Sequence, residues 1–540
     1  MSHPSEILSA PRFDAVVVGA GFTGVYALER LVSMGLSVKL IEAGSGVGGT
    51  WHWNRYPGAR FDSESYSYGY YHDQELLDSW DWSEKYAGAP EIERYLNHAV
   101  DHWGLREHIQ LDTKVVGAVY NEATKEWDIS LSTGEEVRCK YFVPAVGLLS
   151  ATYTPPFPNM ESFEGQLHHT SRWPHEPVDF TGKKVAVIGT AASGVQIIPK
   201  IAEVAETLTV FQRTPNWATP LNNHPLTKED MASIRANFEE IRAKIDKTWM
   251  AFPHEGPDPR NTFDVSEEER LKKYEQLYRQ GGLSKVSDNF ADMARNPEAN
   301  AAWSGFIADK IRERVKDPVV AEKLIPKDHG FGAKRPPQET NYYEAYNRDN
   351  VALVDLHETP IVTFTPAGIE TTALDFDFDI IVLATGFDAV TGAQLNLNIR
   401  GVDGLELRDA WGEGPITLFG ALVPGFPNLF ITGGPHVGVG NVPRATEHQV
   451  NFIIAAIAKA EAEGATTVAV TDEAARAFVD HVLDAVAALG GNLNYKNNWY
   501  TGGNIPGKVR VFSQYSEGVP EYRRRMEEDA AKGFPGVVFA

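Results

Sequence analysis

The sequence predicts an α/β fold with two Rossmann-like domains and a helical insertion in the second of them. Two glycine-rich loops lead to this prediction: GAGFTG at residues 19–24 and GTAASG at residues 189–194. Each loop follows a short apolar run that suits a buried strand and precedes a helical pattern. In this setting glycines permit a tight turn and let backbone amides approach a pyrophosphate at the helix N-terminus.

The residue at the end of the strand after each loop indicates which nucleotide is bound. After the first loop, VKLIEA places Glu42 where such folds bind the two hydroxyls of a ribose. After the second, LTVFQRT places Arg213 at nearly the same spacing. A carboxylate repels a 2′-phosphate, whereas a guanidinium can hold one. The first site is therefore predicted to bind FAD and the second NADPH.

The residues expected to hold the two nucleotides follow from these loops. For FAD they are Gly19, Gly21, Thr23, Gly24 and Glu42, and for NADPH they are Gly189, Thr190, Ala191, Ser193, Gly194, Arg213 and Thr214. Ala191 departs from the pattern, which has its middle glycine at that position. The approach of the second cofactor to the backbone is therefore expected to be looser or shifted.

Composition excludes several kinds of partner and site. The chain has 540 residues, 43% of them hydrophobic, which suits two or three domains with buried cores. Its formal charge of −23 would repel nucleic acid and anionic membranes. No apolar stretch is long enough to span a bilayer and the N-terminus lacks a signal-peptide pattern, so a cytoplasmic protein is expected. The single cysteine, Cys139, excludes an internal disulfide and a multi-cysteine metal site, and no metal is expected.

The order of patterns along the chain predicts that both nucleotide domains are discontinuous. We expect a first part of the FAD-binding domain at 1–150 and a first part of the NADPH-binding domain at 151–214. A charged, helical insertion is expected at 215–330. The second part of the NADPH-binding domain is expected at 331–384. The second part of the FAD-binding domain, with substrate-pocket and lid loops, is expected at 385–540.

Local patterns predict individual elements within these parts. VVGAVYN, EWDISLS and EVRCKYFVPAVG suit a β meander near the end of the first part. In the insertion, KEDMASIRANFEEIRAKIDKTW indicates a helix, and Ser266 with Glu269 suggests a capping box for another. Strands resume at NVALVDL, IVTFTP and DFDIIVLATGFD. The last of these, ending at Ala384-Thr385-Gly386, is expected to return the chain to the first sheet.

A string between the two loops carries a family resemblance. It has the form F-x-G-x-x-x-H-x-x-x-W-P, with Phe163, Gly165, His169, Trp173 and Pro174 at its fixed positions. It closely resembles the fingerprint of type I Baeyer–Villiger monooxygenases, and among them the phenylacetone, steroid and trimethylcyclopentenylacetyl-CoA type enzymes. GGTWHWNRYPGARFDSES, FGAKR, ATGFD and WYTGGNIPGK also resemble the family, in its order and over essentially the whole chain. Flavin-containing monooxygenases, which oxygenate amines and sulfides, usually lack the Trp-Pro ending.

The resemblance implies insertion of one oxygen atom of O₂ beside a ketone carbonyl, which gives an ester or lactone. In the family, NADPH reduces the flavin, and a peroxyflavin then attacks the carbonyl. The protein must exclude water and hold a fixed cation, and arginine suits this role because it stays charged when partly desolvated. By resemblance Arg335 in FGAKR is that cation and Asp62 in ARFDSES orients it. An ion pair of only structural value is the alternative.

The resemblance also implies further cofactor contacts. Lys334 is expected to bind the 2′-phosphate beside Arg213, with a plain solvated lysine as the alternative. Trp499 resembles a mobile tryptophan that folds over the nicotinamide, in a glycine-rich loop that can act as a lid. The residues expected around the flavin are Gly49, Thr50, Trp51, Trp53, Tyr56, Asp62, Tyr68, Tyr70 and Val115.

His169 is expected to lie in a linker and to coordinate domain movement rather than act as a general base. His168 and His175 nearby lack the helical spacing and acidic companions of a metal site. The segment from Gly433 is a residue or two shorter than in phenylacetone-type relatives, where it lines the ketone pocket. The substrate-pocket candidates are Val437, Gly438, Val439, Gly440, Asn441 and Val442.

Three other functions are alternatives to Baeyer–Villiger oxygenation of a ketone. A flavin-containing monooxygenase acting on nitrogen or sulfur would use the same two cofactors. A two-nucleotide disulfide reductase needs a Cys-x-x-Cys pair, which a chain with Cys139 alone does not have. A non-enzymatic flavin-binding module is disfavoured by Arg335, Asp62 and the NADPH-site residues. The expected partners are a small-molecule ketone and O₂, with the chain as a monomer or weak homo-oligomer.

Overall fold

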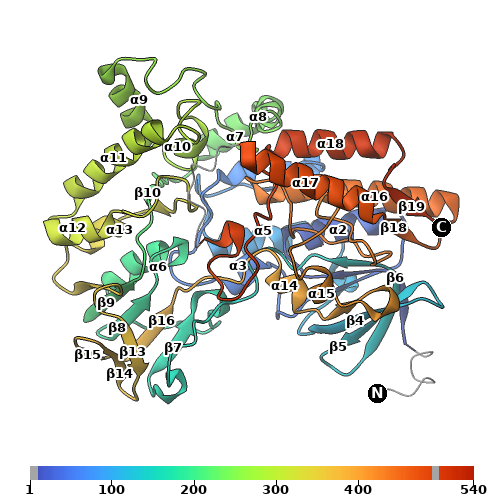
Figure 1. Ribbon diagram of the computed structural model, residues 1–540, viewed down its shortest axis with the longest axis horizontal. Helices are drawn as coiled ribbons and strands as arrows, with labels where there is room; N and C mark the ends of the chain where they lie inside the picture. The colour runs from blue at the N-terminus through green and yellow to red at the C-terminus, as the bar shows by residue number, and fades with distance from the viewer. Residues whose placement is uncertain (1–9, 489–497) are drawn as a thin grey trace.

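Two sheets with parallel cores organise the computed structural model, which describes residues 10–488 and 498–540 (Figure 1). The first sheet has seven strands in the order β17 (Ile399–Arg400), β4 (Val115–Asn121), β5 (Glu126–Leu131), β6 (Glu136–Pro144), β1 (Arg12–Val18), β2 (Val38–Ile41) and β3 (Ile109–Gln110). The second has five parallel strands in the order β12 (Val351–Asp355), β9 (Thr207–Gln212), β8 (Lys184–Ile188), β16 (Ile380–Leu383) and β7 (Gln166–His169). The fold of two Rossmann-like domains is thus confirmed.

Each sheet is built around the strand that leads into a glycine-rich loop. Ala15 to Val17 of β1 are fully buried because the strand is covered on both faces, which accounts for its unbroken apolar run. The chain then turns into α2 (Phe22–Ser33), which packs on β1 and β2. The second unit repeats this arrangement with β8 and α6 (Ala192–Ala202). Both loops therefore lie at the carboxyl end of a central strand, where open α/β sheets bind their ligands.

The predicted β meander is confirmed as β4, β5 and β6, which pair in antiparallel fashion. The helices that cover the first sheet come from distant parts of the chain. Figure 1 shows α16 (Val442–Glu463) between α2 and α18 (Val519–Ala531), and it packs against both. Two further helices border this layer, α5 (Ala89–His102) and α17 (Asp472–Ala488).

A helical lobe, at the upper left of Figure 1, interrupts the second unit. Its helices are α7 (Lys228–Ala236), α8 (Phe238–Ile245), α9 (Glu267–Gln280), α10 (Ser284–Ser287), α11 (Pro297–Arg314) and α12 (Pro318–Leu324). The predicted helix from Lys228 is divided in two at Asn237, whose backbone leaves the helical region at φ −109° and ψ 14°. The Asn237 side chain instead donates to the Ser233 carbonyl at 2.8 Å.

The predicted capping box of α9 is half formed. Ser266 Oγ accepts the Glu269 amide at 3.2 Å, but the Glu269 carboxylate pairs with Arg260 at 2.6 Å instead of returning to the cap. A reciprocal box does form at the start of α7, between Thr227 and Asp230.

One prediction about the later strands was wrong. The strand before Ala384 does not itself rejoin the first sheet: β16 pairs with β8 and β7 in the second, and β17 is the strand that joins β4. β16 lies between β8 and β7, and its backbone hydrogen bonds to these two parallel neighbours hold it in the second sheet. The strand predicted at IVTFTP is confirmed as β13 (Ile361–Phe364), which belongs to a separate antiparallel sheet with β14 (Gly368–Thr371) and β15 (Asp375–Asp377).

Within residues 10–488 and 498–540, no helix combines the length and apolar character needed to cross a bilayer. The same residues contain no group of three or more His, Cys, Asp or Glu side chains placed to hold a metal ion.

Candidate active site

A cavity of about 1410 Å³ lies where the two sheets and the helical insertion meet. It exceeds the usual size of a small-molecule pocket, about 300–1,000 Å³. The predicted residues that line it are Gly19, Gly21, Thr23, Glu42, Gly49, Thr50, Trp51, Trp53, Tyr56, Asp62, Tyr68, Val115, Ser193, Arg335, Val437, Gly438, Val439, Gly440, Asn441, Val442 and Trp499. Tyr70 does not line it, because its hydroxyl donates to the Phe22 carbonyl at 2.8 Å.

The first glycine loop has no room for side chains at two of its positions. A Cβ at Gly24 would lie 1.8 Å from the Gly19 carbonyl oxygen, and one at Gly19 would lie 2.7 Å from that of Ala145. Gly19 also has φ +104°, which favours glycine. The buried Glu42 carboxylate accepts the amides of Ala20 at 2.7 Å and Gly44 at 2.6 Å, which fixes it at the loop. A cradle of backbone amides beside a fixed acid fits the adenosine half of FAD.

The second loop repeats this packing. A Cβ at Gly194 would lie 2.1 Å from the Gly189 carbonyl oxygen, and Gly189 has φ +112°. Ala191 has φ −85° and ψ −167°, against −86° and −174° for Gly21 in the first loop. The alanine thus has the same backbone conformation as Gly21 of the first loop, and the looser or shifted approach of the second cofactor stays a prediction. Thr190 donates to the Thr214 carbonyl at 3.2 Å and ties the loop to the segment after β9.

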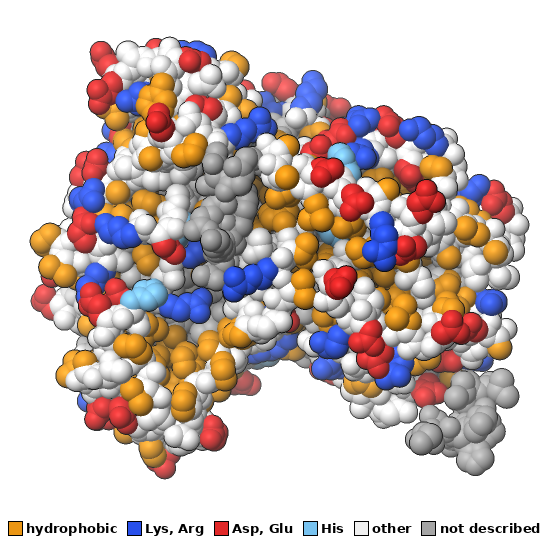
Figure 2. Space-filling model, in the orientation of Figure 1, with side chains coloured by type: hydrophobic (Ala, Val, Ile, Leu, Met, Phe, Trp, Pro, Cys, Tyr) orange, Lys and Arg blue, Asp and Glu red, His pale blue; other side chains and the backbone are white. Residues whose placement is uncertain are grey.

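The end of the second unit that carries the predicted cations Arg213 and Lys334 forms a separate cavity of about 1050 Å³. Arg213, Thr214 and Lys334 all line it, together with Lys327 and Arg510. Figure 2 shows Lys and Arg side chains beside the groove between the two lobes. Burial lowers the pKa of Lys334, the Asp328 carboxylate opposes this shift, and Arg213 adds to it. A cavity with several cations fits a ligand that carries a phosphate.

Arg335 and Asp62, which are 273 positions apart in the sequence, form an ion pair in the large cavity. Arg335 Nη2 lies 2.9 Å from Asp62 Oδ1. The Asp62 side chain is 6% exposed and that of Arg335 is 41% exposed, so the carboxylate is buried behind a guanidinium that faces the cavity. The charge of Asp62 raises the pKa of Arg335 despite partial desolvation. Asn216 holds the backbone of Arg335 through a hydrogen bond of 3.0 Å to its carbonyl.

Aromatic side chains wall the cavity beside this ion pair. Tyr68 stacks on Phe61 at a centroid distance of 4.7 Å and meets Trp51 edge-on at 6.1 Å. Burial raises the pKa of Tyr68 to about 12, so its hydroxyl keeps its proton at neutral pH. Such a wall suits the planar ring of a flavin.

The helical insertion supplies a wall of the cavity that the sequence did not reveal. Its lining residues are Trp249, Met250, Phe252, Leu283, Val286, Phe290 and Met293. No motif marks them: they are the short run WMAF at residues 249–252 and single apolar residues farther along a charged, helical part of the chain. The Met250 carbonyl accepts the Asn441 amide at 2.8 Å, so this wall meets the predicted substrate loop directly.

The loop with Trp499 is held at the mouth of the cavity from two sides. Asn498 donates to the Ala333 carbonyl at 2.9 Å, two residues before Arg335. Farther along, Asn504 donates to the Phe387 carbonyl at 2.9 Å, and Lys508 pairs with Asp388. The loop thereby contacts both FGAKR and ATGFD, which are the ends of the second part of the second domain.

The fixed positions of the family string line neither cavity, although Ser171 and Arg172 between them line the large one. His169 belongs to β7 of the second sheet rather than to a linker, because the backbone of this segment pairs with β16. Its Nε2 lies 3.1 Å from Thr385 Oγ1, and its Nδ1 accepts the Ser171 amide at 3.1 Å. Gly165 is enclosed, since a Cβ there would lie 2.4 Å from the Phe163 ring. Trp173, followed by Pro174, is 6% exposed and packs near Tyr56. These contacts give the string a structural role between the two sheets.

Comparison with known proteins agrees with this geometry. Residues 14–224 match the family model described as flavin-binding monooxygenase-like. A 2-oxo-Δ³-4,5,5-trimethylcyclopentenylacetyl-CoA monooxygenase of Pseudomonas putida is 46% identical over 99% of this chain and 100% of its own. A Baeyer–Villiger monooxygenase of Pseudooceanicola batsensis is 42% identical over 97% of this chain and 96% of its own. The chain belongs to the Baeyer–Villiger monooxygenase family.

Solved structures place this Baeyer–Villiger monooxygenase among flavin enzymes that also bind NADP. A crystal structure of OTEMO in complex with FAD and NADP superposes with a TM-score of 0.94, at 46% identity, over 98% of this chain and 100% of that one. One relative carries a different activity in its name: a phenazine N-monooxygenase of Lysobacter antibioticus is 39% identical over 97% of both chains. The family therefore includes a named N-oxygenase as well as ketone oxygenases.

Proposed function

We propose that this Baeyer–Villiger monooxygenase inserts one oxygen atom of O₂ beside the carbonyl of a ketone, with FAD at the first loop and NADPH at the second. The observation that carries the proposal is the guanidinium of Arg335. It faces a cavity lined by residues of both glycine loops, and a buried carboxylate orients it. When bound, FAD and NADPH supply the hydride transfer and the activation of O₂.

The residues of this chain perform the remaining tasks. Arg335 keeps a positive charge where negative charge develops on oxygen, and Asp62 fixes its orientation. Arg213 and Lys334 distinguish NADPH from NADH through the 2′-phosphate. Trp499 and the apolar wall of the insertion exclude water from the reacting centre.

The lining of the cavity supports a largely apolar ketone as substrate. Val437 and Val439 of the substrate loop face it, as do Met250 and Phe290 of the insertion. The substrate loop and the insertion contribute mostly apolar side chains to the lining, with Arg295 as a charged exception, so the ketone is held mainly by its shape and apolar surface. Enlarging Val437 to Phe should change the range of ketones accepted more than the rate of flavin reduction. We further propose a cytoplasmic monomer or weak homo-oligomer; the buried free thiol of Cys139 suits a reducing compartment.

The proposal is tested with purified protein, NADPH and panels of ketones and sulfides. Ketone-stimulated NADPH oxidation, with a product heavier than the ketone by one oxygen atom, is expected. Oxygenation of nitrogen or sulfur compounds alone would favour the second candidate, which the phenazine N-monooxygenase relative supports. A colourless protein that does not take up FAD would contradict both.

A further inference from the structure

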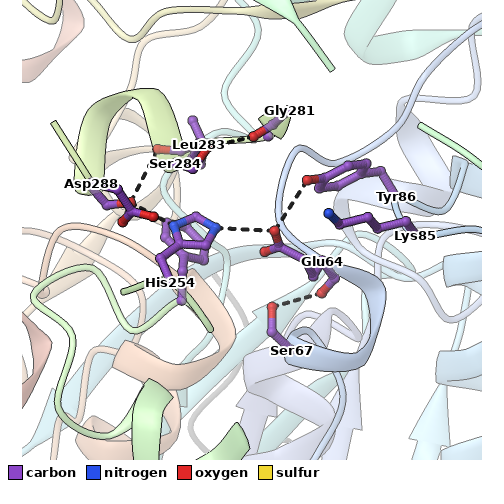
Figure 3. Close-up of polar contacts among 12 residues, drawn as sticks. Glu64, Ser67, Lys85, Tyr86, His254, Gly281, Leu283, Ser284 and Asp288 are labelled. Carbon is purple, nitrogen blue, oxygen red and sulfur yellow. Dashed lines mark hydrogen bonds and ion pairs between the residues drawn. The ribbon is translucent and has the colours of Figure 1, made fainter. Parts of the chain in front are cut away.

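A buried row of polar side chains joins the helical insertion to the segment that carries Asp62. Glu64, two residues after Asp62, is 4% exposed, and His254, between α8 and α9, is 5% exposed. His254 Nε2 lies 3.1 Å from Glu64 Oε1, although the two residues are 190 positions apart. Figure 3 shows the imidazole of His254 between the side chains of Glu64 and Asp288.

Hydrogen bonds hold both ring nitrogens of His254. Ser287 Oγ lies 2.6 Å from His254 Nδ1 and donates to Asp288 Oδ1 at 2.8 Å. The other ring nitrogen faces the Glu64 carboxylate, which can only accept. The row therefore runs from the Glu64 carboxylate through the His254 imidazole and the Ser287 hydroxyl to the Asp288 carboxylate. Charge-assisted bonds of this kind are stronger than neutral ones.

The Glu64 carboxylate depends on this partner. Burial alone would raise the pKa of Glu64, but the charge and hydrogen bond of His254 outweigh burial and hold it below its ordinary value. Tyr86 adds a hydrogen bond of 3.2 Å to the same oxygen, and Lys85 contributes a nearby positive charge. The second oxygen, Oε2, is buried without a hydrogen-bond partner among the described residues. Loss of His254 would therefore leave a buried charge poorly compensated.

A second contact joins the same parts of the chain through the substrate loop. Ser67 donates to the Glu64 carbonyl at 2.7 Å, and the Ser67 carbonyl accepts Asn441 Nδ2 at 2.9 Å. The backbone N–H of Asn441 in turn donates to the Met250 carbonyl at 2.8 Å. Gly440 allows this approach, because a Cβ there would lie 2.2 Å from the Met250 carbonyl oxygen. Hydrogen bonds thus connect three segments, residues 62–67, 250–254 and 440–441, into a closed circuit beside the cavity.

We propose that Glu64 and His254 are a positioning pair that holds the helical insertion against the Asp62–Arg335 ion pair and completes the ketone pocket. This inference rests on the proposed function. Asp62, Met250, Ser287 and Asn441 line the cavity, so the circuit lies directly behind its wall. Neither Glu64 nor His254 lines the cavity, so each acts through the residues beside it. When the pair is lost, residues 250–257 detach from the substrate loop, the pocket admits water, and NADPH is oxidised without oxygenation of the ketone.

The test compares the parent with Glu64→Gln, His254→Phe and the double variant. Glu64→Gln keeps the shape and an acceptor oxygen, so it is the milder change if His254→Phe folds poorly. The matched control is Glu29→Gln, His72→Phe and their combination. His72 Nε2 lies 3.2 Å from Glu29 Oε2 in a more exposed His–Glu pair of the first domain, and neither residue lines a cavity.

Two readouts separate positioning from general stability. Hydrogen exchange at residues 250–257 should be about tenfold faster in the His254→Phe variant, because local opening costs less. The KM for the ketone should rise about tenfold and the share of NADPH consumed without product should grow, while flavin reduction by NADPH without ketone stays near parental. The double variant should be no worse than the more damaging single one, as expected for two residues that act as a unit.

Two results of these measurements would contradict the positioning role of Glu64 and His254. Unchanged hydrogen exchange, or faster exchange with parental KM and coupling, would overturn the positioning role. Singles whose effects multiply in the double variant would show that the two residues act independently and would also overturn it. If the parent oxygenates no ketone, the proposed function fails, and hydrogen exchange still decides whether the pair holds the insertion in place.

Discussion

Replacement of Arg335 by alanine tests the cation on which the reaction depends. The variant removes the charge that faces the cavity and leaves the Asp62 carboxylate, 6% exposed, without its partner at 2.9 Å. Loss of one preorganised group that stabilises developing negative charge costs about 2.7–4 kcal/mol in the transition state, or roughly 10²–10³-fold in kcat. We therefore expect ketone oxygenation to fall by at least that factor.

The same change should also lower the stability of the fold. Removal of one partner from a fully buried ion pair costs about 3–5 kcal/mol, and the cost here should be smaller because Arg335 is 41% exposed and water can replace part of the interaction. We propose that Glu42 and the first glycine loop bind FAD, and their hydrogen bonds do not involve Arg335, so the variant should remain yellow. The assay measures flavin content by absorbance, flavin reduction by NADPH, and ester formation by mass analysis.

Two control variants make this result specific. Arg335→Lys keeps the charge but loses the planar fork, and we expect activity between those of the parent and of Arg335→Ala. Arg279→Ala removes a surface ion pair with Glu275, at 2.8 Å, and should leave activity unchanged. Ester formation by Arg335→Ala at near-parental rates would refute the assignment of Arg335 as the catalytic cation.

Three further predictions address the cofactor sites and stability. Joint replacement of Arg213 and Lys334 by alanine should raise the KM for NADPH about tenfold or more and narrow the preference over NADH, because the 2′-phosphate loses its cations; an unchanged ratio of kcat/KM for the two nucleotides would contradict this. Gly24→Ala places a Cβ 1.8 Å from the Gly19 carbonyl oxygen, so the purified variant should lack flavin absorbance, whereas a fully yellow protein would count against the cradle. Burial lowers the pKa of His436 from its ordinary 6.5 to about 4, so the unfolded chain binds the proton first. The free energy of unfolding should therefore fall as pH drops from 6.5 towards 4, by about 3 kcal/mol from this group at ~1.36 kcal/mol per pKa unit, and urea titrations of His436→Asn should show a weaker dependence.

Much of the fold could be predicted from local sequence. The strand–loop–helix pattern at each glycine loop requires only neighbouring residues, because the turn and the close helix packing leave no space for a Cβ at Gly24 or Gly194. The acid or base after the next strand is likewise a local pattern. Local patterns predicted the fold less well where long-range pairing decides, as with β16 in the second sheet.

The sequence by itself determined the two nucleotide loops, the difference between Glu42 and Arg213, and the family to which the chain belongs. Only the tertiary structure decided which distant residues meet: Asp62 with Arg335 across 273 positions, and Glu64 with His254 across 190. It also decided that the insertion walls the pocket. The physical reason is that a turn or a strand is specified by contiguous residues. The path by which the chain leaves the second sheet and returns to the first depends instead on packing across the whole molecule, which no single segment of the sequence contains.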